Sequence, residues 1–251
     1  MRNICLKLSY SGKNYHGWQI QKNALTVQEV FQNALEKVLK EPKLEIKGCS
    51  RTDTGVHANE YFVSFKTSSP IILEKIPFAL NFFLPKNIAV KSALEVPMDF
   101  HARYSCISKE YIYKIWNNKI RNPFLDGYAF HYWYNIDIGF LNECALYFVG
   151  EHDFTSFCTL DKRERKSLVR KVECFKVFKE DYFLILKVKA NGFLYNMVRI
   201  MVGTLLRFNK NKENPKKISD IILAKDRSKA GPTVVPCGLY LNKVFYKGIN
   251  C

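Results

Sequence analysis

Two hydrophobic periodicities alternate along the chain, and this alternation constrains the fold more than any other feature of the sequence. Ile4, Leu6 and Leu8 recur at period two, which predicts a strand with one buried face. A helical period follows over residues 26–39, where Thr26 and Glu29 form a capping box ahead of an apolar stripe. Strands and helices are interspersed twice with short connections, so we expect an α+β fold of two similar halves.

The remaining elements follow from the same two patterns. Further strands are predicted at 44–46, 61–66, 109–117, 168–178, 181–190 and 238–246, and further helices at 138–149, 195–208 and 216–224. No linker or low-complexity tract separates them, so the two halves should be joined tightly. We place the boundary near residue 105, which gives an N-terminal half of residues 1–105 and a C-terminal half of residues 106–251.

The charge of the chain favours a polyanionic partner. There are 39 Lys and Arg residues against 23 Asp and Glu residues, a formal net charge of +16. Nucleic acid is the leading candidate. A membrane surface would also attract this charge, but no stretch approaches the roughly 18 apolar residues of a spanning helix. The first residues lack the pattern of a secretory signal, so we expect a cytoplasmic protein.

The cysteines do not indicate a metal or a disulfide framework. All eight are scattered, with no CxxC pair and no neighbouring Cys/His cluster. Reduced, mostly buried thiols are therefore expected.

One loop brings several reactive residue types together. In SRTDTGVHA (50–58) an arginine, an aspartate, a glycine and a histidine fall between two predicted strands. Gly55 permits the positive φ of a tight turn, which puts Asp53 at the loop tip. Asp53 is a candidate catalytic carboxylate, although an aspartate here can also bond only its own backbone as an Asx-turn. His57, at the start of a strand, is more typical of a packed or hydrogen-bonded histidine than of a metal ligand.

Arg199 is an anomaly in the segment NGFLYNMVRIMVGTLL. Helical spacing places it with Asn196 and Gly203 on a narrow semi-polar stripe beside an apolar face. A buried guanidinium needs an acceptor, because an unpaired buried charge is costly. The sequence leaves three partners open for Arg199: solvent, a structural carboxylate, or a functional carboxylate elsewhere in the chain.

Aromatic and basic residues are interleaved around the predicted strand at 109–117. Tyr111 and Tyr113 share one face, Lys109 is next to them in sequence, and Arg103 precedes the strand. This pattern suits stacked bases along a phosphate backbone, although strand aromatics are mostly core residues. The run KRERK (162–166), which contains Arg163 and Arg165, is either a phosphate contact or a solvated loop.

Six ordered segments together resemble the tRNA pseudouridine synthase A (TruA) family. They are YHGWQIQ (15–21) with TVQ (26–28), SRTDTGVHA (50–58), FHARYS (100–105) with KEYIYKI (109–115), GEHDFTSF (150–157), GFLYNMVRIMVG (192–203) and AGPTVVPCGLYL (230–241). The segments span nearly the whole chain. Ser50, commonly glycine in the family, and Thr54, commonly alanine, depart from the pattern beside Asp53.

The resemblance implies a pseudouridine synthase fold, with two similar α/β halves, mainly antiparallel sheets and a central basic cleft. It implies isomerisation of uridine to pseudouridine in the anticodon stem-loop of tRNA, at positions 38, 39 and 40 in bacterial members, by a homodimer whose tRNA crosses both subunits. By motif, Asp53 matches the catalytic aspartate and Arg199 its paired arginine. Tyr111 matches the tyrosine that stacks on the substrate, Arg51 the arginine that displaces the target base, and Leu239 an apolar pocket residue.

This reaction needs no cofactor and no metal, because the N1 glycosidic bond is cleaved and the uracil is rejoined through C5 without net redox change. An ionised carboxylate can attack ribose C1′ or uracil C6, or abstract a proton in a glycal-type route. The sequence does not distinguish these routes. Two other classes remain open: a non-catalytic RNA-binding protein, which needs no such carboxylate, and a metal-dependent nuclease, which needs clustered carboxylates or histidines. No protein partner and no membrane association are implied.

Overall fold

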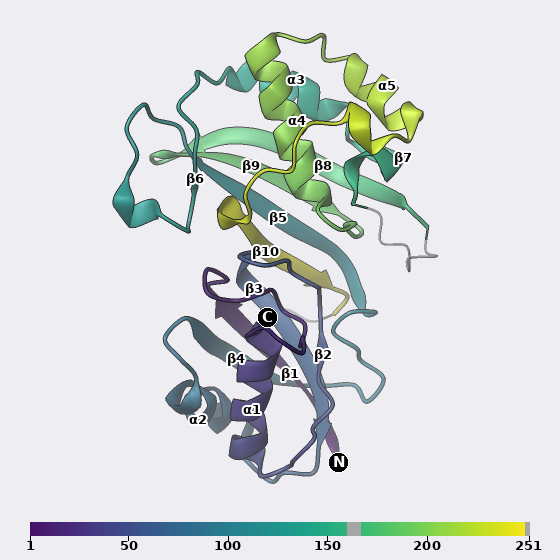
Figure 1. Cartoon of the computed structure of the whole chain (residues 1–251). Coiled ribbons are helices and arrows are strands. Elements are labelled where there is room, and N and C mark those ends of the chain that lie inside the picture. The colour runs from purple at the N-terminus through teal and green to yellow at the C-terminus, as the bar shows by residue number, and fades with distance from the viewer. Residues whose placement is uncertain (160–166, 249–251) are drawn as a thin grey trace. The chain divides into compact units, whose positions relative to one another are not determined.

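The computed structural model describes residues 1–159 and 167–248 (Figure 1), and the chain divides into two compact units. Unit 1 comprises Met1–Ile107 and Tyr240–Cys251, and unit 2 comprises Ser108–Leu239. The first unit therefore takes its last strand from the far end of the chain.

Unit 1 is a mainly antiparallel sheet with two helices. Strand β1 (Arg2–Tyr10) pairs antiparallel with β3 (His57–Thr67) and with β4 (Ile88–Val96). The short β2 (Lys47–Gly48) also pairs with β3, and β10 (Leu239–Tyr246) runs parallel to it. Helices α1 (Val27–Leu39) and α2 (Ile76–Phe83) pack against each other and cover one face of the sheet (Figure 1).

The local chemistry explains why α1 begins where the sequence predicts. The Thr26 side chain accepts a hydrogen bond from the Glu29 backbone N–H at 3.4 Å, as in a capped helix. The apolar stripe is buried, with Phe31 and Leu35 inaccessible to solvent. The predicted start of this helix is confirmed.

The predicted strand at 44–46 is wrong by a few residues, because β2 lies at Lys47–Gly48. The backbone of Leu44 bonds to α1 side chains instead of a strand: its N–H donates to Glu36 Oε1 at 3.1 Å, and its carbonyl accepts from Gln32 Nε2 at 3.1 Å. The patterns also missed α2 and β4 in unit 1.

Unit 2 repeats the architecture of a sheet with helices. Strands β5 (Cys106–Trp116), β9 (Phe183–Ala190), β8 (Val169–Glu180) and β7 (Gly150–Asp153) pair antiparallel in that order, and β6 (Phe130–His131) runs parallel to β5. The helices are α3 (Ile138–Leu146), α4 (Met197–Asn211) and α5 (Lys217–Ala224). Helix α4 is largely buried, with Met197, Ile200 and Met201 inaccessible to solvent.

The predicted α+β class with mainly antiparallel sheets is confirmed by both units. Short 3₁₀ turns complete them at Leu73–Lys75, Pro123–Leu125, Thr155–Phe157, Arg227–Lys229 and Pro236–Gly238. None of the helices described is long and apolar enough to cross a bilayer. No disulfide joins the seven cysteines that the structure describes.

Candidate active site

Asp53 begins a tight turn immediately before β3. Its backbone carbonyl accepts from Val56 N–H at 3.1 Å, and Gly55 has a φ of 77°, which residues with a side chain rarely adopt. Asp53 is half-buried, whereas Arg51 and Thr54 are exposed. The sequence placed Asp53 at a loop tip, and the turn has this geometry.

Backbone hydrogen bonds join the segment at residues 15–18 to this turn. Trp18 N–H donates to Thr52 O at 3.1 Å, and Gly55 N–H donates to Tyr15 O at 3.1 Å, so the two bonds bracket Asp53. Gly17, with a φ of 84°, allows the close approach, since a Cβ there would lie 2.4 Å from Thr52 O. The same segment is bonded to the first turn of α1, because Val27 N–H donates to Gly17 O at 3.1 Å.

Aromatic side chains pack beside the turn and bond to the residues that precede Asp53. Trp18 stacks on Tyr61 with ring centroids 4.1 Å apart, and the Tyr10 hydroxyl lies 2.8 Å from Thr52 Oγ1 in a buried hydrogen bond. The Tyr61 hydroxyl donates to Ser50 O. In the sequence, residues 15–18 are recognisable only as part of the family resemblance. Their supporting role was missed because backbone bonds between distant segments have no sequence signature.

His57 has a structural role in unit 1. It is inaccessible to solvent, its Nδ1 accepts from Gly12 N–H at 3.1 Å, and its ring stacks on Tyr240 at 4.5 Å. An accepting Nδ1 places the ring proton of the neutral imidazole on Nε2. The geometry therefore agrees with the packed, hydrogen-bonded histidine expected from the sequence.

Arg199, in the first turn of α4, has protein acceptors within unit 2. Its Nε donates to Val234 O at 2.7 Å and its Nη1 donates to Asn196 Oδ1 at 2.7 Å. The side chain is half-buried. These bonds explain how the apolar first half of the helix carries a guanidinium. The pairing of Arg199 with Asp53 involves different units and stays a prediction.

Tyr111 and Tyr113 lie on one face of β5, as the alternation predicts. Tyr111 is 5% exposed and meets Phe193 edge-on with ring centroids 5.0 Å apart. The Tyr113 hydroxyl donates to Val235 O at 2.7 Å, and burial raises the pKa of Tyr113 well above its usual value. Leu239 is buried, at 5% exposure.

The remaining predicted RNA contacts are spread over several elements. Arg103 and Lys109 are half-buried, and the Arg103 guanidinium lies 5.9 Å from the centroid of the Tyr104 ring. Arg163 and Arg165 lie outside the described residues. Roles in RNA binding stay predictions for all four.

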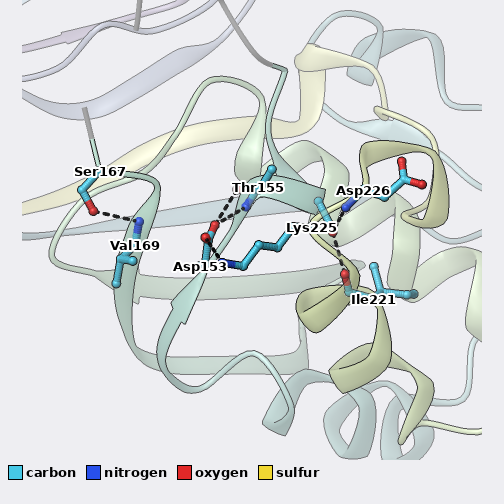
Figure 2. Close-up of polar contacts among 8 residues, drawn as sticks. Asp153, Thr155, Ser167, Val169, Ile221, Lys225 and Asp226 are labelled. Atoms are coloured by element: carbon cyan, nitrogen blue, oxygen red, sulfur yellow. Dashed lines mark hydrogen bonds and ion pairs between the residues drawn. The ribbon is translucent and has the colours of Figure 1, made fainter. Parts of the chain in front are cut away.

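Polar contacts join the motif at 150–157 to the end of α5 and to the residues directly after it (Figure 2). Asp153 accepts from Thr155 N–H at 3.0 Å and pairs with Lys225 Nζ at 2.9 Å. Ser156 Oγ donates to Ile221 O at 2.6 Å and accepts from Asp226 N–H at 2.8 Å. Burial alone would raise the pKa of Asp153, but the bonds from Thr155 and Lys225 outweigh it and lower that pKa.

Among the described residues, no group of three or more His, Cys, Asp or Glu side chains is arranged to hold a metal ion. The arrangement instead offers a half-buried carboxylate on a braced turn in unit 1. In unit 2 it offers a fixed guanidinium and buried tyrosines. These are the components expected for covalent or acid–base chemistry by a carboxylate.

Comparison with known proteins assigns the chain to a family. The family model described as tRNA pseudouridine synthase matches residues 8–105 and 144–247. Proteins named tRNA pseudouridine synthase A are similar over 98% of this chain and 100% of their own length. They include those of Thermoanaerobacter sp. (strain X514), 46% identical, Caldicellulosiruptor saccharolyticus, 45% identical, and Clostridium acetobutylicum, 42% identical.

A solved structure titled "Crystal Structure of a Cbf5-Nop10-Gar1 Complex" matches 81% of this chain and 44% of that chain, with 14% identity and a TM-score of 0.38. A similarity of this size adds nothing to the assignment. The family model and the relatives, in contrast, cover most of the chain and confirm the predicted enzyme class and fold family. The chain belongs to the tRNA pseudouridine synthase A family.

Proposed function

We propose that this chain isomerises uridine to pseudouridine in the anticodon stem-loop of tRNA, at positions 38, 39 and 40, with Asp53 as the nucleophile. The observation that carries the proposal is the braced turn, which holds a half-buried carboxylate between two backbone bonds in a chain of this family. A turn needed only to connect two strands does not require this degree of support.

Asp53 supplies the chemistry. An ionised carboxylate is a competent nucleophile toward ribose C1′ or uracil C6, and it can equally serve as the base of a glycal route. The glycosidic bond to N1 breaks, the uracil turns within the closed site, and a bond from C1′ to C5 forms. In the last step C5 loses its proton, and N1, which no longer carries the ribose, ends protonated, so the product is an isomer of the substrate. No redox partner is needed, so the proposed reaction uses no cofactor.

Other side chains keep the Asp53 carboxylate ionised and position the target uracil. Arg199, from the C-terminal half, pairs with Asp53 and keeps it ionised, because a nearby positive charge lowers a carboxyl pKa. Tyr111 stacks on the target uracil beside the apolar Leu239. Arg51, exposed next to Asp53, displaces the target base from its helix so that the base can flip into the site.

The charge of the chain supports the choice of partner. A net charge of +16 favours the phosphate backbone of tRNA, and Arg103, Lys109, Arg163 and Arg165 are proposed phosphate contacts. The proposed working form is a cytoplasmic homodimer with tRNA crossing both subunits.

Pseudouridine mapping on unmodified tRNA tests the proposal. The tRNA is incubated with wild-type protein, with Asp53→Asn and with Asp220→Asn, and product is located by carbodiimide labelling and primer extension. Asp220 is exposed on α5, so its variant repeats the chemical change away from the proposed site. We expect product in the anticodon stem-loop with wild type and Asp220→Asn only. Turnover by Asp53→Asn would reject the nucleophile, and tight binding without product in any sample would favour a non-catalytic RNA-binding protein.

A further inference from the structure

Asn196 occupies the N-cap of α4 but does not cap the helix with its side chain. An asparagine there normally accepts from the backbone N–H of the second or third helical residue. The side chain of Asn196 makes no such bond. Its Oδ1 instead accepts from the side chain of the third helical residue, Arg199, at 2.7 Å. Asn196 therefore holds the Arg199 guanidinium instead of capping the helix.

The backbone at Asn196 favours this residue type. Its φ of 61° and ψ of 4° lie in the left-handed region, where asparagine is enriched among residues that have a side chain. The conformation starts α4 with the side chain directed toward Arg199. Few other residue types both adopt the left-handed backbone conformation readily and carry a side-chain oxygen that reaches the Arg199 guanidinium.

A second contact fixes the orientation of the amide. Arginine only donates hydrogen bonds, so the oxygen of the Asn196 amide must face Arg199. The amide nitrogen then donates to Thr159 Oγ1 at 3.0 Å. Thr159 is itself held, because its N–H donates to Tyr195 O at 3.1 Å. Asn196 is therefore bonded on both sides and cannot turn without losing both partners.

The guanidinium is held at two different nitrogens. Nη1 is bound by Asn196, and Nε donates to Val234 O at 2.7 Å. Both bonds are charge-assisted, and together they restrict a side chain with many rotamers. Val234 O sets the position of Nε, and Asn196 sets the rotation of the planar group about it.

We propose that Asn196 is a positioning residue for pseudouridine formation, which holds the Arg199 guanidinium in the orientation that its partner carboxylate requires. The inference rests on the proposed function, in which that carboxylate is Asp53. Asn196 acts through Arg199 and does not itself contact the reacting base. Thr159 assists by fixing the Asn196 amide.

The test compares Asn196→Gly with wild type in steady-state assays on tRNA. Glycine retains the positive φ at little cost and removes only the side chain. We expect kcat to fall by roughly tenfold, equivalent to about 1.4 kcal/mol, with the KM for tRNA within about twofold of wild type. We also expect the acid limb of the kcat profile to move to higher pH, because a poorly held Arg199 lowers the carboxylate pKa less.

Asn142→Ala is the matched control for lost stability in unit 2. Asn142 links α3 to β8, since its amide nitrogen donates to Val177 O at 2.8 Å and its oxygen accepts from Val177 N–H at 2.9 Å. This variant should lower the melting temperature while leaving kcat and the pH profile close to wild type. An equal loss of kcat in both variants would show a general stability effect and overturn the inference.

Asn196→Asp provides a second test that keeps the left-handed backbone and the acceptor. Its carboxylate would compete with Asp53 for Arg199, so kcat should fall and the acid limb should again move upward. Wild-type kcat and pH profile in both Asn196 variants would overturn the inference while leaving the proposed function intact. Turnover by Asp53→Asn would instead reject the proposed function on which the inference depends.

Discussion

Gly17→Ala should slow catalysis strongly, although Gly17 is not itself a proposed catalytic residue. The new Cβ would lie 2.4 Å from Thr52 O, whereas ordinary contacts begin near 3.4 Å. Thr52 and its neighbour Asp53 must therefore move by about 1 Å, and a misplacement of about 1 Å can lower a rate roughly 100-fold. The φ of 84° adds about 1–2 kcal/mol of strain for a residue with a side chain.

Single-turnover pseudouridine formation is the appropriate assay, with protein in excess over tRNA so that binding does not limit the rate. We expect Gly17→Ala to bind tRNA like wild type and to react roughly 100-fold more slowly. Gly139→Ala is the control, because the nearest atom to its added Cβ is Asp137 Oδ1 at 3.4 Å. A wild-type rate in Gly17→Ala would show that the segment at 15–18 does not position Asp53.

Four further results are expected. Arg199→Met should lower activity at neutral pH and move its acid limit upward, because the Asp53 pKa rises without the positive charge; full activity would count against the pair. Asp153 has a lowered pKa in the folded state, so its stabilising effect is present at neutral pH and disappears as the pH falls through that value. Asp153→Asn should therefore lower the melting temperature by roughly 2–4 °C at pH 7 and by less near pH 3; an equal effect at both pH values would reject the ion pair with Lys225. The tRNA affinity should fall by about a thousandfold between 50 and 200 mM salt if about six phosphates are contacted, so a salt-independent dissociation constant would reject that interface. Sedimentation should show a dimer, and a monomer at all concentrations would contradict the proposed assembly.

Elements with strong periodicity were predicted well. Helix α1 begins directly after its capping residue Thr26, and β1, β9 and α5 fall close to their predicted ranges. Errors occurred where side chains of one element satisfy the backbone of another. At Leu44 the apolar alternation was correct, but Gln32 and Glu36 take the backbone bonds that a strand would have used. Helix α2 was missed because its sequence, IPFALNFF, is almost entirely apolar, so no polar face marks the helical period.

The sequence by itself determined the family, the class of reaction and the candidate groups Asp53, Tyr111 and Arg199, because these depend on residue types at fixed spacing. It also predicted that Arg199 needs an acceptor, since a buried charge must be paired. Only the tertiary structure decided which atoms meet that need. It showed Val234 O and Asn196 Oδ1 on Arg199, and Tyr15 and Trp18 on either side of Asp53. The contacts of Val234, Tyr15 and Trp18 join segments far apart in the chain through backbone atoms common to every residue, so no local pattern specifies them. Asn196 and Arg199 are only three residues apart, and helical spacing placed them on one stripe, but it did not show that their side chains bond.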